Sequence, residues 1–98
     1  MSITEKQRIH LRKLAHNLKP LVIVGQAGLT ENVISEIDST LAHHELIKVR
    51  INGADKAARQ AIIDNIVEQT GADWVLSIGH ICALYRPAEN PGIILPKI

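Results

Sequence analysis

The residues best suited to binding chemistry are two glycines that enclose the stretch Gly25-Gln26-Ala27-Gly28. They follow the apolar run 21–24 and precede a segment with helical periodicity. Glycine adopts positive φ readily and has no side chain, so backbone N–H groups in this loop, together with the start of the next helix, could approach a phosphate closely. A plain strand-to-helix turn also needs glycine, and the spacing alone favours that simpler interpretation.

Known nucleotide-binding and catalytic patterns are missing from the sequence. No Lys-Ser/Thr pair follows Gly28, as a P-loop requires, and no third glycine completes a dinucleotide-binding fingerprint. Ser77 has neither a histidine nor an acid at a suggestive spacing. The adjacent His43 and His44 would point about 100° apart on a helix, which suits a helix end better than a metal site. We therefore predict no catalytic residue, no metal and no cofactor.

Basic side chains are unevenly distributed along the chain. The formal net charge is only +1, yet residues 1–28 hold five Lys and Arg side chains and one acidic one, whereas residues 29–47 hold four acidic side chains and no Lys or Arg. Such a polarity can create a local basic surface, and basic surfaces commonly bind phosphates. Ordinary solubilising charge is the simpler explanation for any single residue. The candidate phosphate contacts are Arg8, Arg12, Lys13, Lys19, Lys48, Arg50 and Arg86.

Composition narrows the kind of protein further. With one Trp, one Tyr and no Phe, binding of a nucleic acid would be mainly electrostatic rather than based on stacking. The longest apolar runs span four or five residues, far short of the roughly 20 that a membrane helix needs. The single cysteine, Cys82, can form no internal disulfide, which agrees with a reducing compartment. We expect a cytoplasmic protein with a single domain over residues 1–98.

The first element is predicted as a helix over residues 2–19 that ends before Pro20. Two capping boxes could begin it, either Ser2 with Glu5 or Thr4 with Gln7. Its apolar residues recur at helical spacing and predict a buried stripe of Leu11, Leu14, Ala15 and Leu18. The short β-branched run 21–24 then predicts a strand with most of both faces covered.

The remaining elements alternate between helices and strands. A helix over 30–45 is followed by a strand over 46–52, whose apolar and basic residues alternate. A helix over 54–71 has a predicted core row of Ala58, Ile62 and Ile66. A hairpin over 73–86 turns at Gly79 and His80, and an extended, Pro-rich tail over 87–98 is expected to lie along the body. The order α-β-α-β-α-β-β predicts an α/β protein with a four-stranded mixed sheet of undetermined strand order.

Three stretches carry a resemblance to a known family: "QRIHLRKLAHNLKPLVIVGQAGLT", "ELIKVRI" and "LYRPAENPGIILP". On these stretches the chain resembles a CRM domain (chloroplast RNA splicing and ribosome maturation) of the stand-alone bacterial YhbY type. The resemblance implies a fold similar to the C-terminal domain of translation initiation factor three, with an added N-terminal helix. It also implies RNA binding through Gly25 to Gly28, because the family's GxxG loop is similar to the one by which KH domains hold a nucleic-acid backbone. Family members often carry a lysine after the first glycine, where this chain has Gln26.

The resemblance also implies a biological role. Stand-alone bacterial members are associated with precursors of the large ribosomal subunit, so the expected function is that of a non-catalytic assembly factor that binds ribosomal RNA, with no membrane and no small-molecule substrate as a partner. The alternative is a protein-interaction adaptor, whose partner adds a strand at a sheet edge or docks on the apolar tail residues 93–95. This alternative requires no basic cluster.

Overall fold

The computed structural model describes residues 3–97, and its elements follow the predicted order. The helices are α1 (Glu5–Ala15), α2 (Glu31–His44) and α3 (Lys56–Thr70). The strands are β1 (Pro20–Val24), β2 (Leu46–Ile51), β3 (Asp73–Ile78) and β4 (Ile81–Tyr85), which form one sheet in the order β1-β2-β4-β3. The predicted α/β class with a four-stranded mixed sheet is confirmed.

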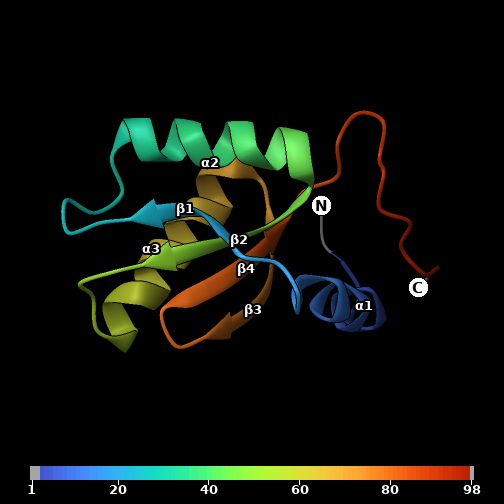
Figure 1. Ribbon diagram of the computed structural model, residues 1–98, viewed down its shortest axis with the longest axis horizontal. Helices are drawn as coiled ribbons and strands as arrows, with labels where there is room; N and C mark the ends of the chain where they lie inside the picture. Colours follow the sequence, from blue (N-terminus) through green and yellow to red (C-terminus); the bar gives the residue numbers. More distant parts are fainter. Residues whose placement is uncertain (1–2, 98) are drawn as a thin grey trace.

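The connections between strands decide their directions. The crossover through α2 makes β1 and β2 parallel, whereas β4 pairs antiparallel with both β2 and β3. As a result, the loop after β1, the loop after β2 and the β3–β4 turn lie together at one end of the sheet, on the left in Figure 1. We call this the loop end; it comprises residues 25–30, 52–55 and 79–80.

Helices cover the two faces of the sheet unequally, with α2 and α3 on one face and α1 on the other (Figure 1). Because side chains alternate along a strand, each strand can contribute to a hydrophobic core on either face of the sheet. In β2, Ile47 points to α2 and α3, whereas the adjacent Leu46 points to α1. The larger core contains Val22, Val24, Ile37, Leu41, Ile47, Val49, Ile51, Ile63, Ile66, Ala72, Cys82 and Leu84. The smaller core, under α1, contains Ile3, Leu11, Ala15, Leu46, Val75, Ala83 and Tyr85.

The α1 side of the sheet is less covered than the sequence predicted. The helix ends at Ala15 rather than near residue 19, and it packs over β2, β3 and β4. Leu14 and Leu18 are therefore 42% and 39% exposed, and the prediction that they are buried is wrong. The prediction that both faces of β1 are covered is also wrong, because Leu21 and Ile23 are more than half exposed on this edge strand.

The predicted core row of α3 also needs correction. Ala58 is exposed and Ile62 only half-buried, whereas Ile63, Ile66 and Thr70 are the buried residues of this helix. The buried set occupies the C-terminal half of α3, where the helix lies over the sheet and beside α2. Its first turn, in contrast, projects toward solvent at the loop end, which frees Ala58 from the core.

Local signals in the sequence locate the chain reversals. The Thr4–Gln7 capping box forms in both directions, whereas Ser2 of the alternative box lies outside the described residues. Gly71 ends α3 in the left-handed region, with a φ of 74°. Gly79 also has positive φ and joins β3 to β4 in a two-residue turn, as predicted.

The tail after β4 lies along the body, as expected for its apolar residues. Ile93 and Leu95 pack against the smaller core, and the Gln7 side chain donates a hydrogen bond to the Pro96 carbonyl. The buried Glu45 carboxylate accepts a 2.7 Å hydrogen bond from the Gly92 N–H. These contacts connect the tail to α1 and to the end of α2. Among residues 3–97, no helix is both long and apolar enough to cross a bilayer.

The buried thiol of Cys82 leads to a first prediction. Cys82 is 0% exposed, and burial raises the pKa of its thiol from 9.0 to about 12. We expect a thiol reagent to leave Cys82 unmodified in the native protein at pH 8 and to modify it fully in denaturant. Because the unfolded thiol releases its proton at lower pH than the folded one, this group should also lower the stability progressively as the pH rises from about 9 to about 12. Rapid native labelling would contradict the packing of β4.

Candidate nucleic-acid interface

The GxxG loop is an exposed turn at the loop end. The Gly28 N–H donates a 3.0 Å hydrogen bond to the Gly25 carbonyl, and Gly28 has a φ of 78°. This N–H is therefore occupied within the turn and cannot serve an external phosphate. The N–H groups of Gln26 and Ala27, by contrast, have no acceptor among residues 3–97 and lie on exposed residues. A Cβ at either glycine would meet no heavy atom within 4 Å, so the surroundings of the turn are open.

The Gln26 side chain connects this turn to the next loop. A Cβ on Gly53 would lie 3.1 Å from Gln26 Cγ, so the stem of Gln26 lies over Gly53. Gly53 itself has a φ of 73°, which favours glycine at this contact. The Asn52 N–H donates to the Val24 carbonyl, which holds the two loops together. Gln26 therefore joins the GxxG turn and the loop after β2 into one surface.

A row of three basic residues, here called the sheet row, leads away from this turn on the α1 side of the sheet. It consists of Arg50, Lys48 and Lys19. Arg50 pairs in register with Ile23, two residues before Gly25, and its Nε donates to Asn52 Oδ1 at 3.0 Å. Lys48 lies two residues earlier on the same face of β2 and pairs with Pro20, which directly follows Lys19. Arg50 and Lys19 are exposed and Lys48 is half-buried, so the sheet row is accessible to a polyanion.

Arg8 and Arg12 lie at the opposite edge of the sheet, where they attach α1 to β3. Their Nε atoms donate to the carbonyls of Trp74 and Val75 at 3.1 and 3.0 Å. Both guanidinium carbons lie within 5.7 Å of the Trp74 ring centroid, at a distance typical of cation–π contacts. Glu5 forms ion pairs with both arginines and compensates part of their charge. Trp74, whose role the sequence alone did not suggest, thereby helps to hold α1 against β3.

The last two predicted contacts also lie away from the turn. Lys13 is an exposed residue of α1. Arg86 lies beside Glu45, at the end of the sheet opposite the loop end, and forms an ion pair with Asp38. The same guanidinium donates to the carbonyls of Asp38 and Thr70, so it connects the residue after β4 to the middle of α2 and to the end of α3. The structure therefore places Arg50 next to the turn and Lys48 and Lys19 progressively farther along the sheet row, whereas Arg8, Arg12, Lys13 and Arg86 lie elsewhere.

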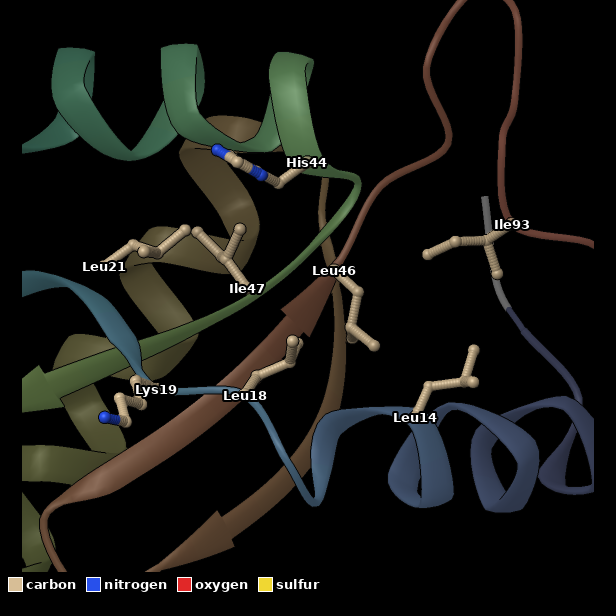
Figure 2. Close-up of a pocket in the computed structure, with 8 residues that line it drawn as sticks. All are labelled: Leu14, Leu18, Lys19, Leu21, His44, Leu46, Ile47 and Ile93. Atoms are coloured by element: carbon tan, nitrogen blue, oxygen red, sulfur yellow. The ribbon is translucent and has the colours of Figure 1, made fainter.

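A mostly apolar cavity lies away from the turn. It has a volume of about 510 Å³, lies near the start of β1, and is here called the apolar groove. Figure 2 shows its side chains, which come from α1, the segment before β1, β1 itself, the end of α2, β2 and the tail. They are Leu14, Leu18, Lys19, Leu21, His44, Leu46, Ile47 and Ile93. Only Lys19 and His44 offer polar groups in this groove.

Titratable groups give no indication of a catalytic or metal centre. Among the residues that the structure describes, no three His, Cys, Asp or Glu side chains are placed to hold a metal ion. Burial raises the pKa of the Asp73 carboxyl despite the nearby Arg8 guanidinium, and burial also raises the pKa of Tyr85. These two residues are partners in the β3–β4 ladder at the end of the sheet opposite the loop end.

Comparison with known proteins identifies the family. The model of the CRS1 / YhbY (CRM) domain matches residues 3–86, which include α1, the sheet and the GxxG turn. The chain belongs to the CRM domain family. A Haemophilus influenzae protein named as an RNA-binding protein is 50% identical to this CRM domain over 98% of this chain and 97% of its own length. A protein of Pseudomonas aeruginosa named as a probable RNA-binding protein is 38% identical over 100% of this chain and 94% of its own.

A solved structure supports the same fold. The solution structure of a hypothetical protein from Staphylococcus aureus superposes on this CRM domain with a TM-score of 0.85 and 38% sequence identity. The match covers 97% of this chain and 100% of the other. The predicted resemblance to stand-alone bacterial CRM domains is therefore confirmed.

Proposed function

We propose that this protein binds RNA without catalysing a reaction, with the GxxG turn and the sheet row as its phosphate contacts. The observation that supports this most directly is the continuity between the two. Gln26 and Ala27 present N–H groups that have no acceptor among the described residues 3–97, and Arg50 pairs with a residue only two positions before the turn. Backbone N–H groups and basic side chains are the groups that proteins commonly use to hold phosphates. Because similar proteins are named as RNA-binding, we take RNA as the polyanion that this surface binds.

The biological target that we infer is ribosomal RNA in precursors of the large subunit, where the protein would act as a cytoplasmic assembly factor. This inference rests on the family resemblance. The test is sedimentation of cell extracts with and without ribonuclease treatment, followed by crosslinking and sequencing of the bound RNA. Association with large-subunit precursors that is lost on digestion supports the proposal. Association that survives complete digestion would favour a protein partner instead.

The salt dependence of binding provides a quantitative test. Phosphate contacts by the three basic residues of the sheet row to a single strand give a slope of about −2 in a plot of log affinity against log salt. This slope should be similar for RNAs of different sequence, because few aromatic side chains are present to read bases. A slope near zero would contradict an electrostatic interface.

Gln26→Lys is expected to strengthen RNA binding. The side-chain stem already lies over Gly53, so a lysine can follow the same path and place an ammonium group beside the turn. One additional phosphate contact should steepen the salt slope by about 0.7 and raise the affinity about fivefold at low salt. Gln69→Lys, an exposed position near the end of α3, is the control for the change in net charge and should change neither quantity. Equal effects of both substitutions would show that only net charge matters.

A protein-interaction adaptor is the second candidate function, and one observation favours it. The apolar groove continues onto the exposed Leu21 of the edge strand β1, where a partner could add a strand. The tail is less suited to the role that the sequence suggested, because Ile93 and Leu95 already pack against the smaller core. Leu21→Glu would weaken association with such a partner while leaving RNA binding by the turn unchanged.

A further inference from the structure

A second cavity, which is lined by basic residues and is separate from the turn and the sheet row, lies on the α2 and α3 side of the sheet. It has a volume of about 260 Å³ and is formed between the first turns of α3 and the β3–β4 hairpin. We call it the α3 pocket. It is lined by Lys56, Arg59, Gln60, Ile63, Ser77 and Gly79.

The polar groups of the α3 pocket suit an anion. Arg59 NH1 donates to the Ala54 carbonyl at 2.9 Å, which holds the guanidinium in place while its other N–H groups remain free to donate. Ser77 Oγ accepts a hydrogen bond from Trp74 Nε1 at 2.9 Å, so the hydroxyl proton of Ser77 can be donated to a ligand.

No negative charge competes for these donors. No carboxylate lines the α3 pocket, and within residues 3–97 no carboxylate oxygen lies within 4.0 Å of a Lys56 or Arg59 side-chain nitrogen. Two cations without a compensating acid produce a local positive potential that attracts anions. The sequence analysis did not single out this pair, because Lys56 and Arg59 acquire a common partner only when the hairpin packs beside α3.

The α3 pocket and the GxxG turn belong to the same end of the molecule. Gln26 touches Gly53 in the second loop, and the Ile51 N–H donates to the His80 carbonyl in the hairpin turn at 2.7 Å. The three loops of the loop end therefore form one continuous surface, on the left in Figure 1. Because β1 and β3 are three strand spacings apart, the turn and the α3 pocket are separated by about 14 Å across the sheet.

We propose that the α3 pocket is a second phosphate site for the same RNA strand that the GxxG turn holds. Lys56, Arg59 and the Ser77 hydroxyl bind one backbone phosphate just beyond the nucleotides that the turn holds, so that the strand crosses the loop end. This inference rests on the proposed RNA binding. It adds the direction in which the RNA strand crosses the protein and the minimum length of RNA that occupies both sites. Short RNAs reach one site, and longer RNAs reach both.

The experiment compares RNA oligonucleotides of two lengths. About four nucleotides match the number that a GxxG loop holds in KH domains, and about ten allow the strand to reach the α3 pocket. The variants are Lys56→Gln and the double variant with Arg59→Gln, and Lys97→Gln in the exposed tail is the control for charge. We expect the double variant to bind the longer RNA about tenfold more weakly with a salt slope reduced by about 1.4, and the shorter RNA as the wild type does.

The possible outcomes separate this inference from the proposed function. Because Arg59 supports Ala54, thermal unfolding checks the double variant, and Lys56→Gln at an exposed position repeats the test with one charge removed. Unchanged binding of the longer RNA by folded variants would overturn the second site and leave RNA binding intact. If the wild type bound neither RNA, the proposed function and this inference would both fail. Inorganic phosphate that shifts the amide resonances of residues 77–79, without any binding of RNA, would show a site for a free anion and also overturn the inference.

Discussion

Gly28→Asp is expected to lower the affinity for RNA about a hundredfold while the protein remains folded. The substitution places a carboxylate at the exposed turn where we propose that a phosphate binds, so that repulsion replaces attraction. Hydrogen bonds to charged groups contribute about 1.5–3 kcal/mol, and a loss of about 2.7 kcal/mol corresponds to a factor of about 100. The measurement is a titration of labelled RNA at constant salt.

The geometry at Gly28 explains why the fold should survive and supplies a matched control. The φ of 78° is unfavourable for most side chains, but Asp and Asn tolerate it better than others, and a Cβ here meets no heavy atom within 4 Å. The cost in stability is therefore about 1 kcal/mol for either residue. Gly28→Asn has the same shape and the same strain without the charge, so it should retain most of the affinity. An equal loss in both variants would attribute the effect to the turn conformation and not to a phosphate.

Arg86→Ala is expected to lower the free energy of unfolding by about 3 kcal/mol and to leave RNA affinity near the wild-type value. The guanidinium donates to the Asp38 carboxylate and to the carbonyls of Asp38 and Thr70, and its side chain is only 23% exposed. Removing it leaves the partly buried Thr70 carbonyl and the two Asp38 oxygens without this donor, and breaks the connection from the end of β4 to the middle of α2 and the end of α3. Denaturant unfolding measures the loss.

Arg50→Ala is the reciprocal control for Arg86→Ala. Arg50 is exposed at the loop end, with one side-chain hydrogen bond to Asn52, so its removal should change stability by no more than about 0.5 kcal/mol. The same change should weaken RNA binding and reduce the salt slope by about 0.7. If Arg86→Ala weakened RNA binding and Arg50→Ala did not, the assignment of the interface to the loop end would be wrong.

Much of the architecture could be predicted because its signals are local. The Thr4–Gln7 capping box and the glycines at chain reversals depend on residues a few positions apart, and the structure contains them where expected. Helical spacing located the three helices but not every buried residue, because Leu14, Leu18 and Ala58 are exposed. The crossover and the hairpin also determined which strands are parallel. Strand order could not be predicted, because the insertion of β4 between β2 and β3 depends on contacts between distant segments.

The candidate site also has features that local sequence predicts and features that depend on contacts between distant segments. The sequence by itself determined the fold class, the GxxG turn at the end of β1 and the basic character of the chain. Only the tertiary structure decided which cations can act with that turn: Arg50 lies next to it and Lys48 and Lys19 continue the row along the sheet, whereas Arg8 and Arg12 attach α1 to β3 and Arg86 connects α2 to α3. The physical reason is that a charge pattern along the chain carries no information on partners. An arginine is available to a ligand only if no carbonyl, carboxylate or ring from a distant segment already occupies it.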